Sequence, residues 1–180
     1  MHNSKAPGND LIVHIWHKKF NSIWKYLTKI FNTFLDGTVS IPSWLPMSKT
    51  ILLPKTDETT KPKNYRHIAC ENNIFKVYTG ILSRFINQHC IDNEIIFQEQ
   101  TANRPGSWGC IDQLLINKTV MEEVVKYNRN VFIIWLDYKK AYDSVPHDWI
   151  IQSLELAKVP KNIVNTIKKI LRQLSAKMYL

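Results

Sequence analysis

An acidic residue ends the most hydrophobic run of the chain. Residues 131–136 read Val-Phe-Ile-Ile-Trp-Leu, and Asp137 follows directly. Six apolar residues in a row, mostly β-branched or aromatic, predict a strand that is buried on both faces. Folding alone gives no reason for an acid at the end of such a strand, whereas a site that holds a cation or a proton does. The pattern therefore makes Asp137 a candidate metal ligand or acid–base group.

A second group of residues suits phosphate chemistry. Residues 158–177 hold six cations and no acid: Lys158, Lys161, Lys168, Lys169, Arg172 and Lys177. A helix face with this charge can follow a phosphate backbone, with binding that weakens as salt rises. An ordinary solvated helix face explains the pattern equally well. The whole chain has a formal net charge of +9 and a pI of about 9.5, which favours a polyanionic partner.

Hydrophobic periodicity predicts the elements that position these groups. Apolar residues recur at three- and four-residue steps in five stretches, which predicts helices over residues 11–35, 72–91, 111–127, 149–157 and 162–174. The first stretch can also form two helices with a break near Asn21. Gly37 is expected to stop the first helix. Besides 131–136, short strands are expected at 49–53 and 176–180, and loops at 41–46, 55–64 and 98–109.

The turn after Asp137 also has a purely local explanation. Asp143 or Ser144 can cap a following helix that carries Pro146 in its first turn. This explanation accounts for the turn, but it leaves Asp137 unexplained.

Composition excludes several classes of protein. A chain of 180 residues with 44% hydrophobic residues and six Trp can bury a core and is not disordered by composition. Cys70, Cys90 and Cys110 are widely spaced, which supports neither a zinc ribbon nor a redox motif. An odd cysteine count without a signal peptide suggests an intracellular location, in the cytoplasm or the nucleus. No apolar run approaches the ~18 residues of a membrane span.

Residues 136–147, LDYKKAYDSVPH, resemble the first catalytic motif of the reverse transcriptase palm, in the form found in non-LTR (LINE-type) retrotransposons. Looser similarities occur in the family's order and spacing at residues 5–8, 53–55, 64–68, 76–84 and 98–114. Asn9-Asp10-Leu11 and His67 depart from the family pattern.

The resemblance implies an α+β fold, the fingers and palm portion of a right-hand polymerase. Residues 1–125 would form the fingers and a template-contacting region, and residues 126–180 the first part of the palm. The implied activity is RNA-directed DNA synthesis, in which a nucleotidyl group passes from a dNTP to a DNA primer on an RNA template. Two Mg²⁺ ions would serve this reaction.

The resemblance also assigns roles to residues. Asp137 is the catalytic Mg²⁺ ligand, and Tyr142 gates the sugar 2′ position; a packed core aromatic is the alternative for Tyr142. Tyr138 and Ala141 complete the nucleotide-binding segment, in which Lys139 and Lys140 lie at the turn. Triphosphate is expected to bind Lys55 and Arg66, whereas an ordinary solvated loop is the preferred interpretation of Lys61 and Lys63. Residues assigned to nucleic-acid binding are Arg104, Lys168, Lys169 and Arg172.

The sequence lacks one part of the family's chemistry. Family members supply further metal ligands from a later Y-x-D-D hairpin, and no Asp-Asp pair occurs in this chain. We therefore expect a fragment truncated before that hairpin and inactive alone. Two alternatives remain: a non-catalytic basic nucleic-acid-binding remnant, or an unrelated Mg²⁺-dependent protein in which Asp112 or Asp148 joins Asp137.

Overall fold

The computed structural model describes residues 6–97, 99–102, 106–138, 141–142 and 144–179, without the side chains of residues 14, 17 and 18. The chain divides into two compact units. The first unit comprises residues 1–89 and 147–180, and the second comprises residues 90–146. Each unit is described by itself below.

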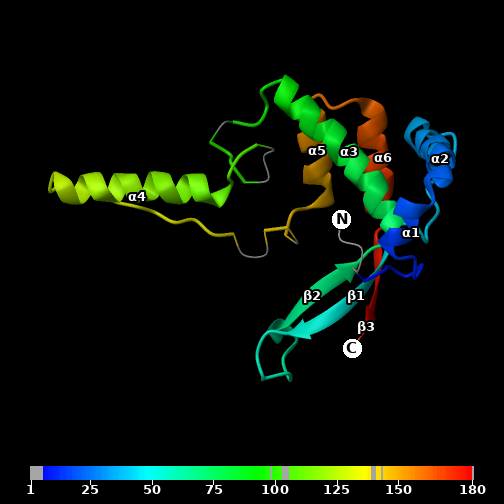
Figure 1. The fold of residues 1–180 in the computed structure, drawn as a ribbon, viewed down its shortest axis with the longest axis horizontal. Helices are drawn as coiled ribbons and strands as arrows, with labels where there is room; N and C mark the ends of the chain where they lie inside the picture. The colour runs from blue at the N-terminus through cyan, green and yellow to red at the C-terminus, as the bar shows by residue number, and fades with distance from the viewer. Residues whose placement is uncertain (1–5, 98, 103–105, 139–140, 143, 180) are drawn as a thin grey trace. The chain divides into compact units, whose positions relative to one another are not determined.

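Helices and a small sheet form the first unit (Figure 1). Its elements are α1 (His14–Lys19), a 3₁₀ turn (Asn21–Ile23), α2 (Trp24–Asp36), β1 (Met47–Pro54), a second 3₁₀ turn (Pro62–Asn64), β2 (Tyr65–Cys70), most of α3 (Asn73–Asp92), α5 (His147–Leu156), α6 (Lys161–Gln173) and β3 (Ser175–Tyr179). The predicted break near Asn21 is confirmed, and Gly37 ends α2 with a φ of 76°, a backbone conformation that glycine adopts without strain.

The sheet has the strand order β2-β1-β3 (Figure 1). β1 and β2 form an antiparallel hairpin in which Leu53 lies opposite Arg66. β3 joins the other edge of β1 in parallel, with Lys49 opposite Lys177. The hydroxyl of Ser48 donates a hydrogen bond of 3.4 Å to the carbonyl of Ser175 and so ties the two parallel strands together at their start.

The core of the first unit lies among its helices. Its members come mainly from α2, α3, α5 and α6: Leu27, Phe31, Phe34, Ile41, Leu45, Phe75, Tyr78, Leu82, Ile151, Val159, Ile163, Val164 and Ile170. The Tyr78 ring lies 4.8 Å from that of Phe31 and 5.8 Å from that of Phe34, centroid to centroid, and meets the latter edge-on. Burial raises the pKa of the Tyr78 phenol, and the Thr166 hydroxyl partly offsets that rise.

Asn72 joins three segments just before α3. Its side chain is 1% exposed, and its amide donates hydrogen bonds to the carbonyls of Trp44 (3.0 Å) and Leu45 (3.2 Å). Its amide oxygen accepts a bond of 3.2 Å from the backbone N–H of Asp10. Gly8 packs so closely that a Cβ there would lie 2.5 Å from the Asn72 backbone nitrogen, so only glycine fits.

The second unit is built around one helix, α4 (Cys110–Lys126). Asp112 supports its start, because its carboxylate accepts a hydrogen bond of 3.1 Å from the backbone N–H of Trp108. After α4 the chain turns at Asn128, which has a φ of 46°, and the N–H of Arg129 bonds the carbonyl of Val124 at 3.0 Å. None of the residues of α4 is buried.

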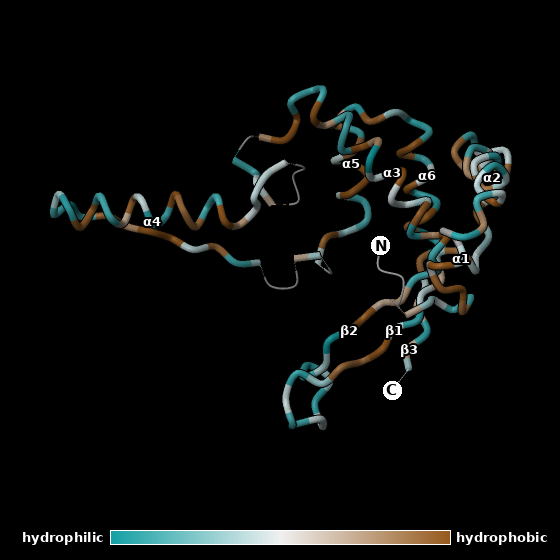
Figure 2. The backbone as a smooth tube through the Cα atoms, viewed as in Figure 1, coloured by the Kyte–Doolittle hydropathy of each residue, from teal (hydrophilic) through white to brown (hydrophobic). Residues whose placement is uncertain are grey.

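The predicted buried strand over 131–136 is wrong. These residues form an extended segment that joins no sheet, and their side chains are exposed; Phe132 is 95% exposed and Leu136 83%. Figure 2 shows this hydrophobic trace directly after α4. A strand needs a neighbouring strand to bond its backbone, and the described strands pair elsewhere. Asp137 therefore does not end a central strand.

The local explanation of the next turn is also corrected. α5 begins at His147, after Pro146, and the Ser144 hydroxyl bonds the carbonyl of Ala141 at 3.5 Å rather than capping the helix. Asp143, the other expected cap, lies outside the described residues. Within the described ranges, no helix has both the length and the apolar character that crossing a membrane requires.

Candidate nucleic-acid interface

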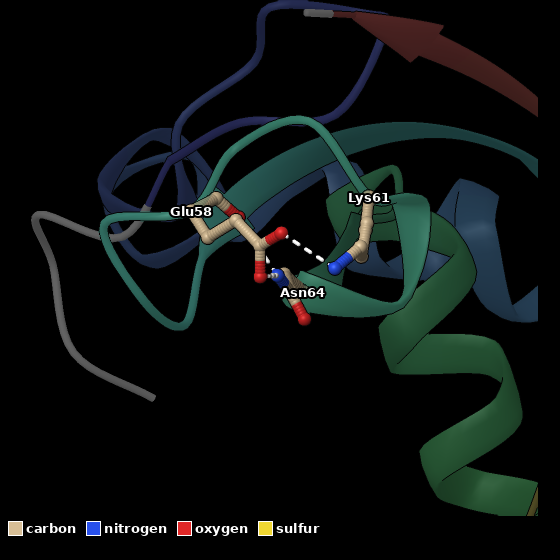
Figure 3. A network of polar contacts seen from close by, with 3 residues as sticks. All are labelled: Glu58, Lys61 and Asn64. Atoms are coloured by element: carbon tan, nitrogen blue, oxygen red, sulfur yellow. Dashed lines mark hydrogen bonds and ion pairs between the residues drawn. The ribbon is translucent and has the colours of Figure 1, made fainter.

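The β1–β2 hairpin carries its own polar network at the tip. The carboxylate of Glu58 pairs with the Lys61 ammonium at 2.6 Å, and the Asn64 side-chain amide donates to the carbonyl of Glu58 at 2.8 Å (Figure 3). The Tyr65 hydroxyl bonds the carbonyl of Thr59 at 3.0 Å. These contacts shape the tip, and the Lys61 ion pair with Glu58 agrees with the interpretation of Lys61 as a solvated residue.

Lys55 and Arg66 are brought together by the register of this hairpin. Arg66 lies opposite Leu53, and the backbone N–H of Lys55 bonds the carbonyl of Asn64 at 2.7 Å, which extends the pairing by one step. In this register Lys55, one residue beyond the end of β1, is a diagonal neighbour of Arg66, and the Lys55 ammonium donates a hydrogen bond of 3.4 Å to the carbonyl of Lys63. Both are exposed. Two adjacent cations on a hairpin are well placed for a polyphosphate.

The same face of the sheet holds two further cations: Lys49, which the sequence did not single out, and Lys177, which the sequence placed in the basic C-terminal stretch. Lys49 precedes Leu53 by four residues and so points to the same side, and Lys177 of β3 lies opposite Lys49. The Lys49 ammonium lies 4.7 Å from the centre of the Tyr179 ring. We call Lys49, Lys55, Arg66 and Lys177 the basic sheet face. Alternation along 49–55 was visible in the sequence, but the parallel pairing with β3 was not.

α6 presents a second basic surface. Ile163, Val164, Thr166 and Ile170 are buried on one side of the helix, and Lys168, Lys169 and Arg172 are exposed. The cations therefore point away from the core, as both the phosphate-binding and the solvated-face interpretations require.

The residues around the predicted catalytic position belong to the second unit. Asp137, Tyr138 and Ala141 are exposed, and Tyr142 is 87% exposed. The alternative of a packed core aromatic at Tyr142 is therefore wrong. Arg104, Lys139 and Lys140 lie outside the described residues.

These residues do not by themselves fit a divalent metal site. Mg²⁺ requires several well-placed oxygen ligands. Within the described part of the chain, no group of three or more His, Cys, Asp or Glu side chains is arranged to hold a metal ion. Neither Asp112, which bonds Trp108, nor Asp148, in the first turn of α5, joins Asp137 in such a group.

Comparison with known proteins identifies the family of the chain. The sequence profile of the family described as reverse transcriptase (RNA-dependent DNA polymerase) matches residues 53–179. This chain belongs to the reverse transcriptase family. The matched region begins near the end of β1, contains the hairpin tip, β2 and the segment around Asp137, and ends in β3.

Several curated relatives are retrotransposon proteins. This chain is 25% identical over 165 residues to the retrovirus-related Pol polyprotein from type-2 retrotransposable element R2DM of Drosophila melanogaster. The alignment covers 92% of this chain and 15% of the relative. Identity to the Pol polyprotein from type-1 retrotransposable element R2 is 25% in Bradysia coprophila, covering 92% of this chain and 18% of the relative. Identity to the protein of the same description in Nasonia vitripennis is 26%, and that alignment covers 85% of this chain and 14% of the relative.

These matches confirm the prediction of a reverse transcriptase domain of a non-LTR retrotransposon. The chain spans between 14% and 18% of the length of these relatives. Its mixed helices and strands agree with a polymerase fold. The family uses divalent metal ions, a nucleic-acid template and primer, and dNTPs. The roles assigned to single residues, and the division at residues 125 and 126, stay predictions.

Proposed function

We propose that this chain forms the fingers and the first part of the palm of an RNA-directed DNA polymerase. In this proposal the β1–β2 hairpin binds the triphosphate of the incoming dNTP. The observation that carries it is the position of Lys55 and Arg66 as diagonal neighbours on one exposed face. The guanidinium of Arg66 would meet two phosphate oxygens at once, and Lys55 would add a point charge.

The remaining roles complete the proposal. Tyr138, Ala141 and Tyr142 would line the sugar, with the Tyr142 ring excluding a 2′-hydroxyl. RNA template and DNA primer would lie on basic surfaces that include Arg104, Lys168, Lys169 and Arg172. Magnesium is the proposed ion of the complete polymerase, and Asp137 is one of its proposed ligands. Asp137 alone cannot hold this ion, which needs several oxygen ligands. The proposed location is intracellular.

Fluorescence anisotropy with a labelled dNTP tests the hairpin. The Lys55→Ala/Arg66→Ala variant should weaken binding about tenfold or more, because two charge-assisted contacts are lost. A matched control is Lys61→Ala/Lys63→Ala, which removes the same charge from the same hairpin and should change binding less than about threefold. Equal losses in both variants would show that only net charge matters and would contradict the triphosphate site.

Primer extension tests the catalytic assignments. The 180-residue chain alone should not extend a DNA primer on an RNA template with dNTPs and Mg²⁺. A longer chain that adds a downstream paired-aspartate segment should do so, and Asp137→Asn should abolish this activity. Tyr142→Ala in that longer chain should admit ribonucleotides. Extension by the 180-residue chain that survives Asp137→Asn would contradict the catalytic assignment of Asp137.

A second candidate function is nucleic-acid binding without chemistry, and the exposed cations of α6 favour it. Binding of an RNA–DNA hybrid should weaken as salt rises, and Lys168→Ala/Lys169→Ala/Arg172→Ala should reduce the slope of log affinity against log salt by about two to three. The Lys19→Ala/Lys25→Ala/Lys29→Ala variant removes three exposed cations from α1 and α2 and serves as the control. A salt slope unchanged by the α6 variant would exclude α6 from the interface.

A further inference from the structure

Two serines of the chain follow an arginine by three positions, Ser107 and Ser175. The acidic substrate cleft of a basophilic Ser/Thr protein kinase recognises a cation at that distance, because charges around the acceptor set the specificity of a kinase. For Ser175 the arginine is Arg172, and two further cations, Lys168 and Lys169, precede it. The structure distinguishes the two serines.

Ser107 is engaged by its own loop. Its hydroxyl donates a hydrogen bond to the carbonyl of Thr101 and accepts one of 3.2 Å from the backbone N–H of Gly109. The residue is only partly exposed. A kinase must reach both the hydroxyl and the flanking backbone, so at Ser107 these bonds would have to break first.

Ser175 is open by contrast. It is exposed and is the first residue of β3, so the chain from Ser175 to Tyr179 is already extended. Its backbone carbonyl, and not its hydroxyl, accepts the hydrogen bond from Ser48. α6 ends two residues earlier, at Gln173, and the end of a helix opens at low cost. The hydroxyl and the arginine that precedes it are therefore accessible together.

The register of β3 places Ser175 on the basic sheet face. Ser175 lies opposite Met47, and Lys177 lies opposite Lys49. Because residues two apart on a strand point to the same side, the side chains of Ser175, Lys177 and Lys49 share one face. Lys177 is the next residue on that face of β3, and Lys49 is the diagonal neighbour on β1, a spacing that a long side chain spans. A group added to Ser175 would therefore lie within reach of two ammonium groups.

We propose that Ser175 is the acceptor of a basophilic protein kinase and that its phosphate pairs with Lys49 and Lys177. In the transfer, the Ser175 oxygen forms a bond to the γ-phosphorus of ATP, and the bond from that phosphorus to the bridging oxygen breaks to release ADP. The hydroxyl proton passes to the carboxylate base of the kinase. The reaction needs no residue of this chain other than the acceptor.

The charge of the product decides which neighbours it joins. A phosphoserine carries a charge of about −1.5 to −2 at pH 7. The C-terminal end of α6 disfavours it, but that end carries only about half a negative charge, against the full positive charges of Lys49 and Lys177. Pairing with the two lysines therefore outweighs the helix dipole. It also neutralises the end of the basic sheet face at which these lysines lie.

The modification would regulate the binding of polyanions to this end of the sheet. The effect on nucleic-acid binding rests on the proposed function, whereas the acceptor and the pairing of its phosphate do not. Three separate measurements distinguish these steps.

Phosphorylation of the 180-residue chain tests the acceptor. With the catalytic subunit of cAMP-dependent protein kinase and Mg-ATP, peptide mass spectrometry should find the phosphate at Ser175. Ser175→Ala and Arg172→Gln should each lower incorporation about tenfold or more, because the first removes the acceptor and the second removes a charge-assisted contact to the kinase. Ser107→Ala is the matched control and should leave incorporation within about twofold. Phosphate on Ser107 at an equal rate, or none on Ser175, would overturn the proposal.

³¹P NMR of the phosphorylated chain tests the pairing. Two adjacent cations should lower the second pKa of the phosphate below its ordinary value of about 6. Lys49→Gln should return the pKa towards that value, and it leaves the sequence around Ser175 intact because Lys49 is remote in the chain. Lys29→Gln on the exposed side of α2 is the control and should leave the pKa unchanged. An ordinary pKa, or one that ignores Lys49, would overturn the pairing.

Fluorescence anisotropy with an RNA–DNA hybrid measures the consequence. Phosphorylation should reduce the slope of log affinity against log salt by about two, because two lysines are withdrawn from phosphate contacts. Binding of a labelled dNTP should change less than about twofold, because Lys55 is eight residues further along the chain than Met47, roughly 26 Å, well beyond the Debye length. An unchanged slope in a chain with the lowered phosphate pKa would contradict nucleic-acid binding by the basic sheet face and leave the modification site standing. Absence of phosphate from Ser175 would do the reverse.

Discussion

α6 and α4 are both helices that the sequence predicts, but the structure uses them differently. α6 buries Ile163, Val164, Thr166 and Ile170 against the other helices of the first unit. α4 buries none of its residues and leaves Leu114, Leu115 and Met121 exposed. An apolar pattern therefore predicts that a helix forms, but it does not say whether a partner is present to cover it. Stability is accordingly concentrated in the first unit.

A matched pair of phenylalanines gives the largest contrast. Phe34 is 4% exposed in the core, whereas Phe132 lies almost entirely in solvent. Phe34→Ala should lower the free energy of unfolding by about 3–5 kcal/mol, because it removes buried surface and leaves a cavity. Phe132→Ala should change it by less than about 0.5 kcal/mol. Urea unfolding of the two variants measures both changes, and equal losses would contradict the contrast.

Asn72→Ala should have the next largest effect. It leaves the carbonyls of Trp44 and Leu45 and the N–H of Asp10 without the bonds that Asn72 makes, and we expect a loss of about 2–4 kcal/mol. Asn165→Ala on the exposed side of α6 is the control, with a change within about 0.5 kcal/mol. A comparable loss in the control would mean that the polar junction is not what ties these segments together.

Hydrogen exchange should separate the two regions without mutation. Amides in α2, α3 and α6 should exchange slowly, because their helical hydrogen bonds lie against the core. Amides of residues 131–136 should exchange at rates close to those of an unfolded peptide, because these residues belong to none of the described strands and are exposed. Slow exchange in this segment would contradict the contrast between the two regions.

Alkaline pH should produce the smallest effect, confined to the first unit. Burial raises the pKa of Tyr78 in the folded state. The neutral phenol therefore contributes fully to the free energy of unfolding below its unfolded-state pKa of about 10, and this contribution is lost as the pH rises above that pKa. Tyr78→Phe should remove this part of the alkaline loss of stability. Tyr26→Phe on the exposed side of α2 should leave it unchanged. Identical pH profiles for all three proteins would assign the alkaline loss to other groups.

Local pattern predicted local structure well. The helix expected over 72–91 is α3 (Asn73–Asp92), and the strands expected at 49–53 and 176–180 are β1 and β3. The exposure of residues 131–136 could not be predicted from the sequence. Whether an apolar segment is buried depends on a neighbouring strand, and hydrophobicity does not identify that strand. For the site, the resemblance named Lys55 and Arg66. It missed Lys49 and Lys177, which meet only through strand pairing between distant parts of the chain.

The parallel pairing of β1 with β3 has a consequence for the order of folding. The bond between Ser48 and Ser175 joins residues 127 positions apart, whereas the β1–β2 hairpin closes a short loop. Closing the longer loop costs more chain entropy, and contacts of high sequence separation form slowly. We therefore expect the hairpin to assemble first and β3 to add last. A ribosome making this chain would hold β1 with one edge open until residues 175–179 had left the exit tunnel.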